Sequence, residues 1–343
     1  MEQKEKIVIF GAGRIGKCVA KMMRYDKDVL YVVDNDSKKW GLKVEGVAIH
    51  SPEMLLDNLD IKIVIAVADY PPIVMQLENM GCSNYVYYSD VYGWQLDCKS
   101  RIILDRHIAE RCSGQYSGRD IKNAWMNHMN CWYGGKVYEQ YLVPNARTLD
   151  VGCGCGTNLF FELLNGCDAY GLECCEWKLD FCKQKIEDFC FPVTWKEKLI
   201  FGYGEELPFS DNYFDVVSSC YVLEHVNDWR KCLQEMIRVV KPGGVMFING
   251  PDYRNSYEEH YGIDIGRPIN ESVEILKEKL IERHESLDIF EELNFITKPL
   301  VLSELEKANV KIYDRETEGV RVDKVEGGFR IWRRIDLIVE KTG

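Results

Sequence analysis

This sequence has no long hydrophobic run, no basic stripe and no C-x-x-C cysteine pair. A helix that spans a bilayer needs about 20 consecutive apolar residues, so we expect no membrane span. The formal net charge is −12. Because nucleic-acid binding needs a clustered positive surface, we expect no nucleic-acid partner. At 343 residues the chain exceeds one ordinary domain, and we expect two hydrophobic cores.

The cysteines are numerous but scattered. There are 14 of them, and the chain begins MEQKEKIVIF, which is not a secretory signal. Structural zinc sites and redox motifs usually place cysteines in C-x-x-C pairs, which are missing here. We therefore expect reduced cysteines that fill core and turn positions in a cytoplasmic protein, and no metal site.

A glycine-rich turn lies near the start of the chain, at Gly11, Gly13 and Gly16. The segment IVIFGAGRIGKCVAKMM has the order strand, turn, helix, and such a turn brings backbone N–H groups close to a ligand. A second strand ends at Asp34, 18 residues after Gly16. That is near the ~20-residue offset at which an acid binds an adenosine ribose. Short strands at VAIH, IKIVIAVA and NYVYYS complete a Rossmann-like unit, placed at residues 1–92.

An oxidoreductase function for this unit lacks supporting chemistry. The chain contains no Tyr-x-x-x-Lys pair, which is the proton relay of short-chain dehydrogenases. A fold alone does not establish a reaction. A nicotinamide-dependent sugar-nucleotide oxidoreductase, or a bifunctional enzyme with Asp34 on a ribose, therefore stays as an alternative.

The most specific pattern is TLDVGCGCGTN at residues 148–158. It places Asp150 at the end of an apolar strand and then alternates glycines with small residues. The strand AYGLE follows and ends in Glu173, and the segments LPFSDNYFDVVSSCYVLEHV and RVVKPGGVMFING come next in that order. In the last segment we expect Lys-Pro-Gly-Gly at residues 241–244 to be the turn into the fifth strand, VMFING. This ordered set resembles the class I S-adenosylmethionine (SAM) methyltransferases of the methyltransferase 11 type.

The resemblance implies an α/β protein with two Rossmann-like doubly wound domains. The C-terminal domain would be a seven-stranded SAM methyltransferase fold with a lid insertion. We place a helical connector at residues 93–144, the methyltransferase domain at 145–343, and its acceptor or lid insertion at 251–300. A long insertion at the carboxyl end of a sheet strand is a usual position for such a site.

The resemblance also implies which residues hold SAM. Gly152 and Gly154 would let the first turn pass under the methionine and ribose, with Asp150 orienting that turn. Glu173 would accept hydrogen bonds from both ribose hydroxyls. The complete set of candidates is Tyr133, Asp150, Gly152, Gly154, Glu173, Cys174, Tyr203, Gly204 and Cys220.

The adenine-binding segment departs from the family pattern. Relatives often have G-D-A-E-E-L-P-F, whereas this chain has GYGEELPF at residues 202–209. Tyr203 thus replaces the Asp that accepts from the adenine amino group, and Gly204 replaces the Ala. We expect Tyr203 to stack on or border the ring instead, with a backbone amide nearby meeting a ring nitrogen.

Methyl transfer to a hydroxyl requires alignment of the acceptor and removal of one proton. Two histidines are candidate bases: His260 in YEEHYG, and His225 directly after the fourth strand. Glu259 is placed to orient His260. An enzyme that relies on alignment alone, without a base, is the third option.

Residues 1–92 resemble the small Rossmann-like domains attached to sugar-modifying and surface-polysaccharide enzymes, including some sugar acyltransferases. The resemblance rests on the segments GAGRIG, VVDND and IHSPEML. It implies that a second nucleotide or nucleotide sugar binds at Gly11, Gly13, Gly16 and Asp34. A docking module without a ligand is the alternative.

We therefore predict a SAM-dependent methyltransferase that acts at oxygen on a small-molecule or carbohydrate-type acceptor. A non-catalytic nucleotide-binding partner protein is a further alternative, against which Gly152, Gly154 and Glu173 argue.

Overall fold

A computed structural model describes the chain in several segments. These are residues 4–88, 103, 136–259, 261–285, 287–315, 321–325 and 328–343. The described residues fall into two compact units. The first contains residues 4–88 with segments 154–164 and 176–198, and the second contains 136–153, 165–175 and the rest from 199 onward. Most of the predicted connector at 93–144 and the predicted boundary at residue 92 lie outside the described residues.

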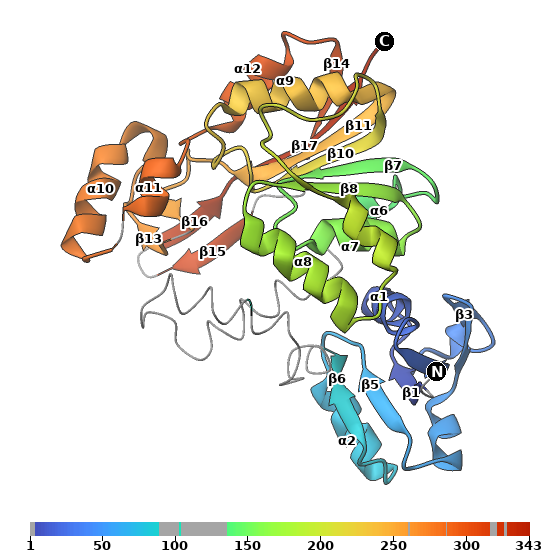
Figure 1. Cartoon of the computed structure of the whole chain (residues 1–343). Helices are drawn as coiled ribbons and strands as arrows, with labels where there is room; N and C mark the ends of the chain where they lie inside the picture. Colours follow the sequence, from blue (N-terminus) through green and yellow to red (C-terminus); the bar gives the residue numbers. More distant parts are fainter. Residues whose placement is uncertain are drawn as a thin grey trace. The chain divides into compact units, whose positions relative to one another are not determined.

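The first unit contains a six-stranded sheet in the order β3-β4-β2-β1-β5-β6 (Figure 1). Every pair of neighbours is parallel except β3 with β4. Because β1 pairs with both β2 and β5, the strand order reverses at β1, where sheets of this type form their ligand crevice. The strands are β1 (Glu5–Phe10), β2 (Lys27–Val33), β3 (Lys43–Val44), β4 (Val47–His50), β5 (Lys62–Ile65) and β6 (Tyr85–Tyr87).

A helix follows the first glycine-rich turn, as predicted for the segment IVIFGAGRIGKCVAKMM. Ser51 accepts a hydrogen bond from the N–H of Glu53 at 3.2 Å and so caps a short 3-10 helix, with Pro52 as its first residue. The helices are α1 (Arg14–Met23), η1 (Ser37–Lys39), η2 (Pro52–Asp57), α2 (Pro71–Asn79), α7 (Thr157–Leu164), α8 (Glu176–Asp188) and η3 (Val193–Lys198). Val8, Phe10, Ile63 and Ile65 lie in the buried core of this sheet.

The second unit contains a seven-stranded sheet in the order β14-β17-β11-β10-β7-β8-β9. The five strands from β11 to β9 are parallel, and β17 runs antiparallel to both β11 and β14. This confirms the predicted fold, including its antiparallel final strands. The strands are β7 (Arg147–Val151), β8 (Asp168–Glu173), β9 (Leu199–Phe201), β10 (Phe214–Cys220), β11 (Val240–Pro251), β14 (Val310–Asp314) and β17 (Arg334–Lys341).

The start of β11 differs from the sequence prediction. The Lys-Pro-Gly-Gly segment was expected to be a turn that precedes the strand, but the strand runs through it. Phe214 of β10 pairs with Val240 and Val216 pairs with Val245, so extra residues bulge out of β11 between these pairs. Gly243 takes a φ of +77° within the bulge, a conformation that suits glycine. The bulge therefore takes the place of the expected turn, and β11 continues through it.

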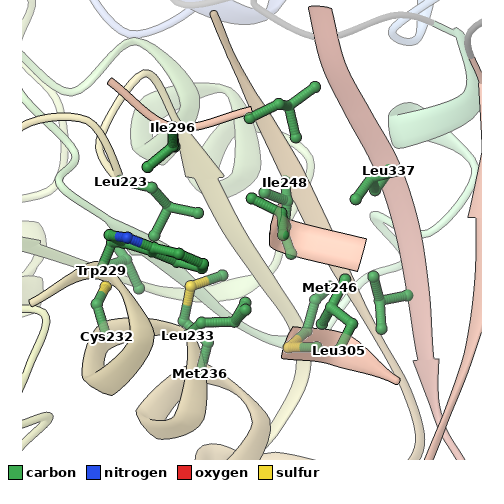
Figure 2. Packing of buried hydrophobic residues seen from close by; sticks show 14 of the residues in the cluster. Leu223, Trp229, Cys232, Leu233, Met236, Met246, Ile248, Ile296, Leu305 and Leu337 are labelled. Carbon is green, nitrogen blue, oxygen red and sulfur yellow. The ribbon is translucent and has the colours of Figure 1, made fainter. Parts of the chain in front are cut away.

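The core of the second unit lies between the sheet and α9 (Trp229–Val239). Asp228 caps this helix by accepting hydrogen bonds from the N–H groups of Arg230 and Lys231, each at 3.1 Å. Buried residues recur at helical spacing along one face, and Figure 2 shows them against Met246 and Ile248 of β11. The α9 residues in this contact are Trp229, Cys232, Leu233 and Met236.

The segment after β11 belongs to the second unit and contributes to its core. The hairpin of β15 and β16 was not predicted. The elements here are β12 (Tyr257–Glu258), β13 (Ile263–Asp264), η4 (Ile269–Glu271), α10 (Val273–Glu282), α11 (Asp288–Glu292), α12 (Lys298–Leu305), β15 (Arg321–Val325) and β16 (Gly328–Trp332), and α6 (Lys136–Glu139) precedes β7. Thr297 occupies the predicted N-cap position of α12, but its side chain makes no capping hydrogen bond. None of the helices in the described segments has the length and apolar character that crossing a bilayer requires.

Candidate active site at the carboxyl ends of the parallel strands

Asp150 lies near the end of β7 and is buried. It accepts a hydrogen bond from Ser218 Oγ of the neighbouring strand β10 at 3.0 Å. The carboxylate therefore links the two central strands directly beneath the glycine-rich turn. This position is compatible with the predicted role of orienting that turn.

The turn after β7 requires glycine at position 152. Gly152 has a φ of +69°, and a Cβ on it would lie 2.4 Å from Val222 Cγ2. Its N–H donates to the Leu172 carbonyl of β8 at 2.8 Å, and the N–H of Cys153 donates to the same carbonyl at 3.0 Å. Gly154 has a φ of +54°, so it also occupies the left-handed region. A side chain is thus excluded sterically at position 152, whereas at position 154 only the backbone conformation favours glycine.

Glu173 ends β8, the strand next to β7, and only 5% of its surface is exposed. Its Oε1 accepts a hydrogen bond from the N–H of Cys175 at 3.0 Å, and the Cys174 thiol lies 3.7 Å away. The Glu173 carboxylate is therefore buried and fixed at the carboxyl end of β8, and its predicted contact with a ribose stays a prediction. Cys174 is exposed beside it.

The predicted adenine side of the site combines an exposed aromatic ring with a buried glycine. Tyr203 is 54% exposed, and its ring meets Phe201 edge-to-face at a centroid distance of 6.0 Å. Gly204 is buried, and a Cβ there would lie 2.6 Å from Cys232 Sγ. Burial raises the pKa of the Cys232 thiol to about 12, so this residue packs as a neutral group. Both positions are compatible with an aromatic border to an adenine ring.

Arg238 on α9 holds the loop that follows Gly204, and the sequence analysis missed it. Its guanidinium donates to the carbonyls of Leu207 and Phe209 at 2.9 and 2.7 Å, and to Glu235 at 2.7 Å. Glu235 in turn accepts from the N–H of Leu207 at 2.9 Å. These bonds raise the pKa of Arg238 and lower that of Glu235. The Glu-x-x-Arg spacing on a helix was the available signal.

The end of β10 has an unusual backbone. Tyr221 takes a φ of +57°, which is uncommon for a residue with a bulky side chain. Its N–H donates to the Asn249 carbonyl of β11 at 2.8 Å, and this bond helps to hold the conformation. The predicted residue Cys220 is half-buried directly before it. The chain therefore turns sharply at the end of β10, directly after the predicted cofactor-binding residue Cys220.

Asn294 from the inserted segment fixes the turn after β10. Its side-chain amide donates to the Val226 carbonyl at 2.5 Å, and its backbone N–H donates to the Glu224 carbonyl at 2.7 Å. The turn carries His225, whose side chain is exposed. The insertion thus positions a candidate base, although no sequence motif marked Asn294.

Three other predicted residues concern the acceptor and methionine ends of the site. Glu259 is half-buried, and its Oε1 is shielded from solvent. His260 and Tyr133 lie outside the described residues. Within the described segments, no group of three His, Cys, Asp or Glu side chains is arranged to hold a metal ion.

The glycine-rich turn of the first unit packs tightly on itself. Gly11 has a φ of +116°, and a Cβ on Gly16 would lie 1.8 Å from the Gly11 carbonyl oxygen. Around Gly13 there is open space for a Cβ. Two of these three glycines are therefore required for the fold of the turn itself, whether or not a ligand binds.

Asp34, predicted to bind a ribose, already has several donors. Its Oδ2 accepts from the N–H of Ala12 at 2.7 Å and from Lys39 Nζ at 3.0 Å, and its Oδ1 accepts from the N–H of Asp36 at 2.8 Å. Burial alone would raise the pKa of Asp34, but these hydrogen bonds lower it below the ordinary value. Asp34 therefore ties the turn after β1 to the segment after β2.

Two segments of the chain match models of known protein families. Residues 149–248 match the model of a methyltransferase domain, and residues 3–86 match the C2185-like N-terminal family. The sugar-enzyme resemblance of residues 1–92 is not confirmed by the C2185-like match.

Curated relatives share this domain but only part of their length. Demethylmenaquinone methyltransferase of Bacillus mycoides is 34% identical over 142 residues, which is 40% of this chain and 57% of that protein. Sterol 24-C-methyltransferase of Schizosaccharomyces pombe is 29% identical over 148 residues, 40% of this chain and 38% of that protein. The chain spans about half the length of the curated relatives it matches.

Solved structures with partial similarity include the YcgJ protein of Bacillus subtilis. It has a TM-score of 0.43 and 15% identity, and the match covers 60% of this chain and 97% of that one. A SAM-dependent methyltransferase from Aquifex aeolicus has a TM-score of 0.36 and 20% identity, over 58% of this chain and 88% of that one.

Proposed function

We propose that this protein is a SAM-dependent methyltransferase that methylates a hydroxyl group of a small-molecule or carbohydrate-type acceptor. The observation that carries the proposal is the pair Gly152 and Glu173. They lie at the ends of adjacent parallel strands, within a segment that matches a methyltransferase domain. One provides close backbone approach, and the other provides a buried carboxylate for a diol.

Bound SAM supplies an electrophilic methyl group on a sulfonium. In the transfer, the carbon–sulfur bond breaks as a bond from carbon to the acceptor oxygen forms, S-adenosylhomocysteine leaves, and the hydroxyl proton passes to a base. We propose His260 as that base with Glu259 as its orienting partner, and His225 as the rival. The exposed His225 ring can reach solvent, whereas Glu259 Oε1 is shielded.

Calorimetric titration tests the cofactor assignment. We expect SAM and S-adenosylhomocysteine to bind one site of the full chain, and Gly152→Val to abolish this binding while the protein stays folded by circular dichroism. A screen of acceptors with radiolabelled SAM would then identify the product. Unaltered SAM affinity in the Gly152→Val variant, or binding of NAD(H) in place of SAM, would refute the proposal and favour the oxidoreductase.

For residues 4–88 we propose a separate nucleotide or nucleotide-sugar site at the turn after β1. The open space at Gly13 and the reversal of strand order at β1 support it. The interactions of Asp34 favour a structural role for that carboxylate over the predicted ribose contact. In titrations with a nucleotide panel, Gly13→Val should remove the second ligand and leave SAM binding intact. If no nucleotide binds, the docking-module alternative holds.

A further inference from the structure

Tyr25, two residues after the end of α1, contacts two aromatic side chains of the segment that matches the methyltransferase model. Its ring centroid is 5.4 Å from that of Phe191 and 5.9 Å from that of Trp195, and both contacts are edge-to-face. Tyr25 itself lies in the segment that matches the C2185-like family. The contact therefore joins, inside the first compact unit, two parts of the chain that match different families.

Arg24 restricts the orientation of the Tyr25 ring. Its guanidinium carbon lies 5.1 Å from the ring centroid, and its Nη2 donates to the Tyr25 hydroxyl at 3.1 Å. The backbone of Arg24 is held on both sides, because its N–H donates to the Ala20 carbonyl at 3.3 Å and its carbonyl accepts from Lys4 Nζ at 2.9 Å. The end of α1 thus presents the Tyr25 ring in a defined position.

Phe160 of α7 extends the contact towards the glycine-rich turn after β7. Its ring centroid lies 5.6 Å from that of Phe191 and 6.3 Å from that of Trp195. The Phe160 side chain is fully buried, and Lys185 Nζ of α8 lies 4.9 Å from its ring centroid. A buried ring enclosed by other rings and a cation does not shift without displacing its neighbours.

Phe160 and Cys182 hold the last part of that turn. A Cβ on Gly156 would lie 2.6 Å from Phe160 Cε2 and 3.0 Å from Cys182 Sγ. The Gly156 carbonyl accepts from the N–H of Phe160 at 2.9 Å, and the Cys182 thiol donates to the Gly154 carbonyl at 3.5 Å. Gly154 and Gly156 have φ values of +54° and +79°, so the turn depends on an uncommon backbone conformation at both glycines. Contacts this close couple the position of Phe160 to the conformation of the turn.

We propose that Tyr25 is a positioning residue for the SAM site. Through the rings described above, it holds Gly154 and Gly156 in the conformation that lets the backbone approach the cofactor. The inference rests on the proposed methyltransferase function. It gives residues 4–88 a task in cofactor binding that needs no ligand of their own. Since α1 begins directly after Gly13, the same helix also connects the first glycine-rich turn with this series of contacts.

Hydrogen exchange and SAM titration of the full chain test the proposal. In Tyr25→Ala without ligand, we expect amide exchange at residues 154–160 to be about three- to tenfold faster, because loss of an aromatic contact favours local opening. SAM affinity should fall by a similar factor, about three- to tenfold. Tyr25→Phe keeps the ring and should retain wild-type behaviour in both measurements. Tyr70→Ala is the matched control, since it removes a tyrosine ring that lies 4.6 Å from Tyr87 within residues 4–88, and it should change neither.

A variant on the other side of the contact gives an independent test. Trp195→Leu should also speed exchange at residues 154–160 and weaken SAM binding. The double variant of Tyr25→Ala and Trp195→Leu should lose less SAM affinity than the sum of the two single variants, because both remove one shared contact. Circular dichroism would establish that each variant is folded at the temperature of the titration.

Three results would overturn the proposal. One is unchanged exchange at residues 154–160 in both Tyr25→Ala and Trp195→Leu. Another is faster exchange with unchanged SAM affinity, which would restrict Tyr25 to a structural role. The third is an equal loss of SAM affinity in Tyr70→Ala, which would trace the effect to general destabilisation. Failure of the wild type to bind SAM refutes the methyltransferase proposal itself, whereas tight binding by the wild type and by all variants refutes only the role of Tyr25.

Discussion

The Asp34 carboxylate accepts a hydrogen bond of 2.7 Å from the backbone N–H of Ala12, across 22 residues of chain. Ala12 lies between two glycines of the turn after β1, so the acid at the end of β2 holds that turn in place. A carboxylate with this task has less capacity for a ribose. The contact gives Asp34 a structural role, and the ribose contact predicted from spacing stays a prediction.

Asp34→Asn should destabilise the protein at neutral pH by about 1–2 kcal/mol, because charged hydrogen bonds are lost. The folded pKa of Asp34 is lowered. Its contribution is therefore fully present above the unfolded value of about 3.9 and is lost as pH falls through the folded pKa. Urea denaturation at pH 7 and at pH 3 should show the difference from wild type shrinking in acid. Asp28→Asn, at an exposed position, serves as the control, and a pH-independent difference would contradict the prediction.

The two glycines after β7 should differ in their tolerance of alanine. Gly152→Ala meets both an unfavourable φ and Val222 at 2.4 Å, whereas Gly154→Ala meets an unfavourable φ with open space around its Cβ. The strain alone costs about 1 kcal/mol. We expect Gly152→Ala to lose SAM binding in calorimetry and Gly154→Ala to weaken it by about tenfold or less. Equal losses of SAM affinity in the two variants would show that contact with the ligand, and not the conformation of the turn, requires glycine at these positions.

Glu173→Ala should weaken SAM binding by about 1.5–3 kcal/mol, the range for hydrogen bonds to a charged group. Glu173→Gln should retain part of that affinity, since the amide oxygen can still accept from one hydroxyl and from the Cys175 N–H. Titration of both variants with SAM and with adenosine locates the effect on the ribose. An equal, small loss for both variants would place Glu173 outside the site.

The strands and the glycine-rich turns were predictable because they depend on local chemistry. Apolar β-branched runs bounded by glycine specify strands and turns wherever they occur, and both sheets match this pattern. The Lys-Pro-Gly-Gly bulge was wrongly predicted as a turn, because a bulge and a turn use the same residues and only pairing with β10 distinguishes them.

The contacts of Arg238 and Asn294 could not be predicted in the same way. Arg238 binds carbonyls 29 and 31 residues away, and Asn294 binds carbonyls about 70 residues away. Such partners are backbone oxygens, which have no sequence signature, so these contacts become visible only once the fold brings the segments together. The same applies to Tyr25, whose ring contacts lie far along the chain.

Asn294→Ala should impair use of the acceptor more than binding of the cofactor. The variant removes the amide that donates to the Val226 carbonyl and loosens the turn that carries Glu224 and His225. We expect about 1–2 kcal/mol of lost unfolding free energy and a raised KM for the acceptor, with SAM affinity nearly unchanged. Leu300→Ala, at an exposed position of α12, is a matched control. A loss of SAM affinity equal to the loss of acceptor use would contradict this assignment.

His260→Ala should lower turnover by about 10²–10⁴ if this residue removes the acceptor proton, while SAM affinity stays nearly unchanged. The wild-type rate should rise with pH as the imidazole loses its proton, and the variant should lack that rise. His225→Ala tests the rival base under the same conditions. Full activity of both variants at saturating acceptor would leave alignment as the sole source of catalysis.

The link from Asn294 to the turn after β10 has a consequence for how such proteins diversify. Residues 251–300 could be expected to be exchangeable between relatives, since the seven-stranded sheet is complete without them. Yet one of their side chains secures the main-chain oxygens of residues 224 and 226, and Tyr253 and Ile296 bond to each other within the segment. A chimaera that takes only residues 251–300 from a relative would mismatch the hydrogen bonds between this segment and the turn after β10. Successful grafts should carry residues 223–226 together with residues 251–300. The short turn and the acceptor specificity would then be exchanged together.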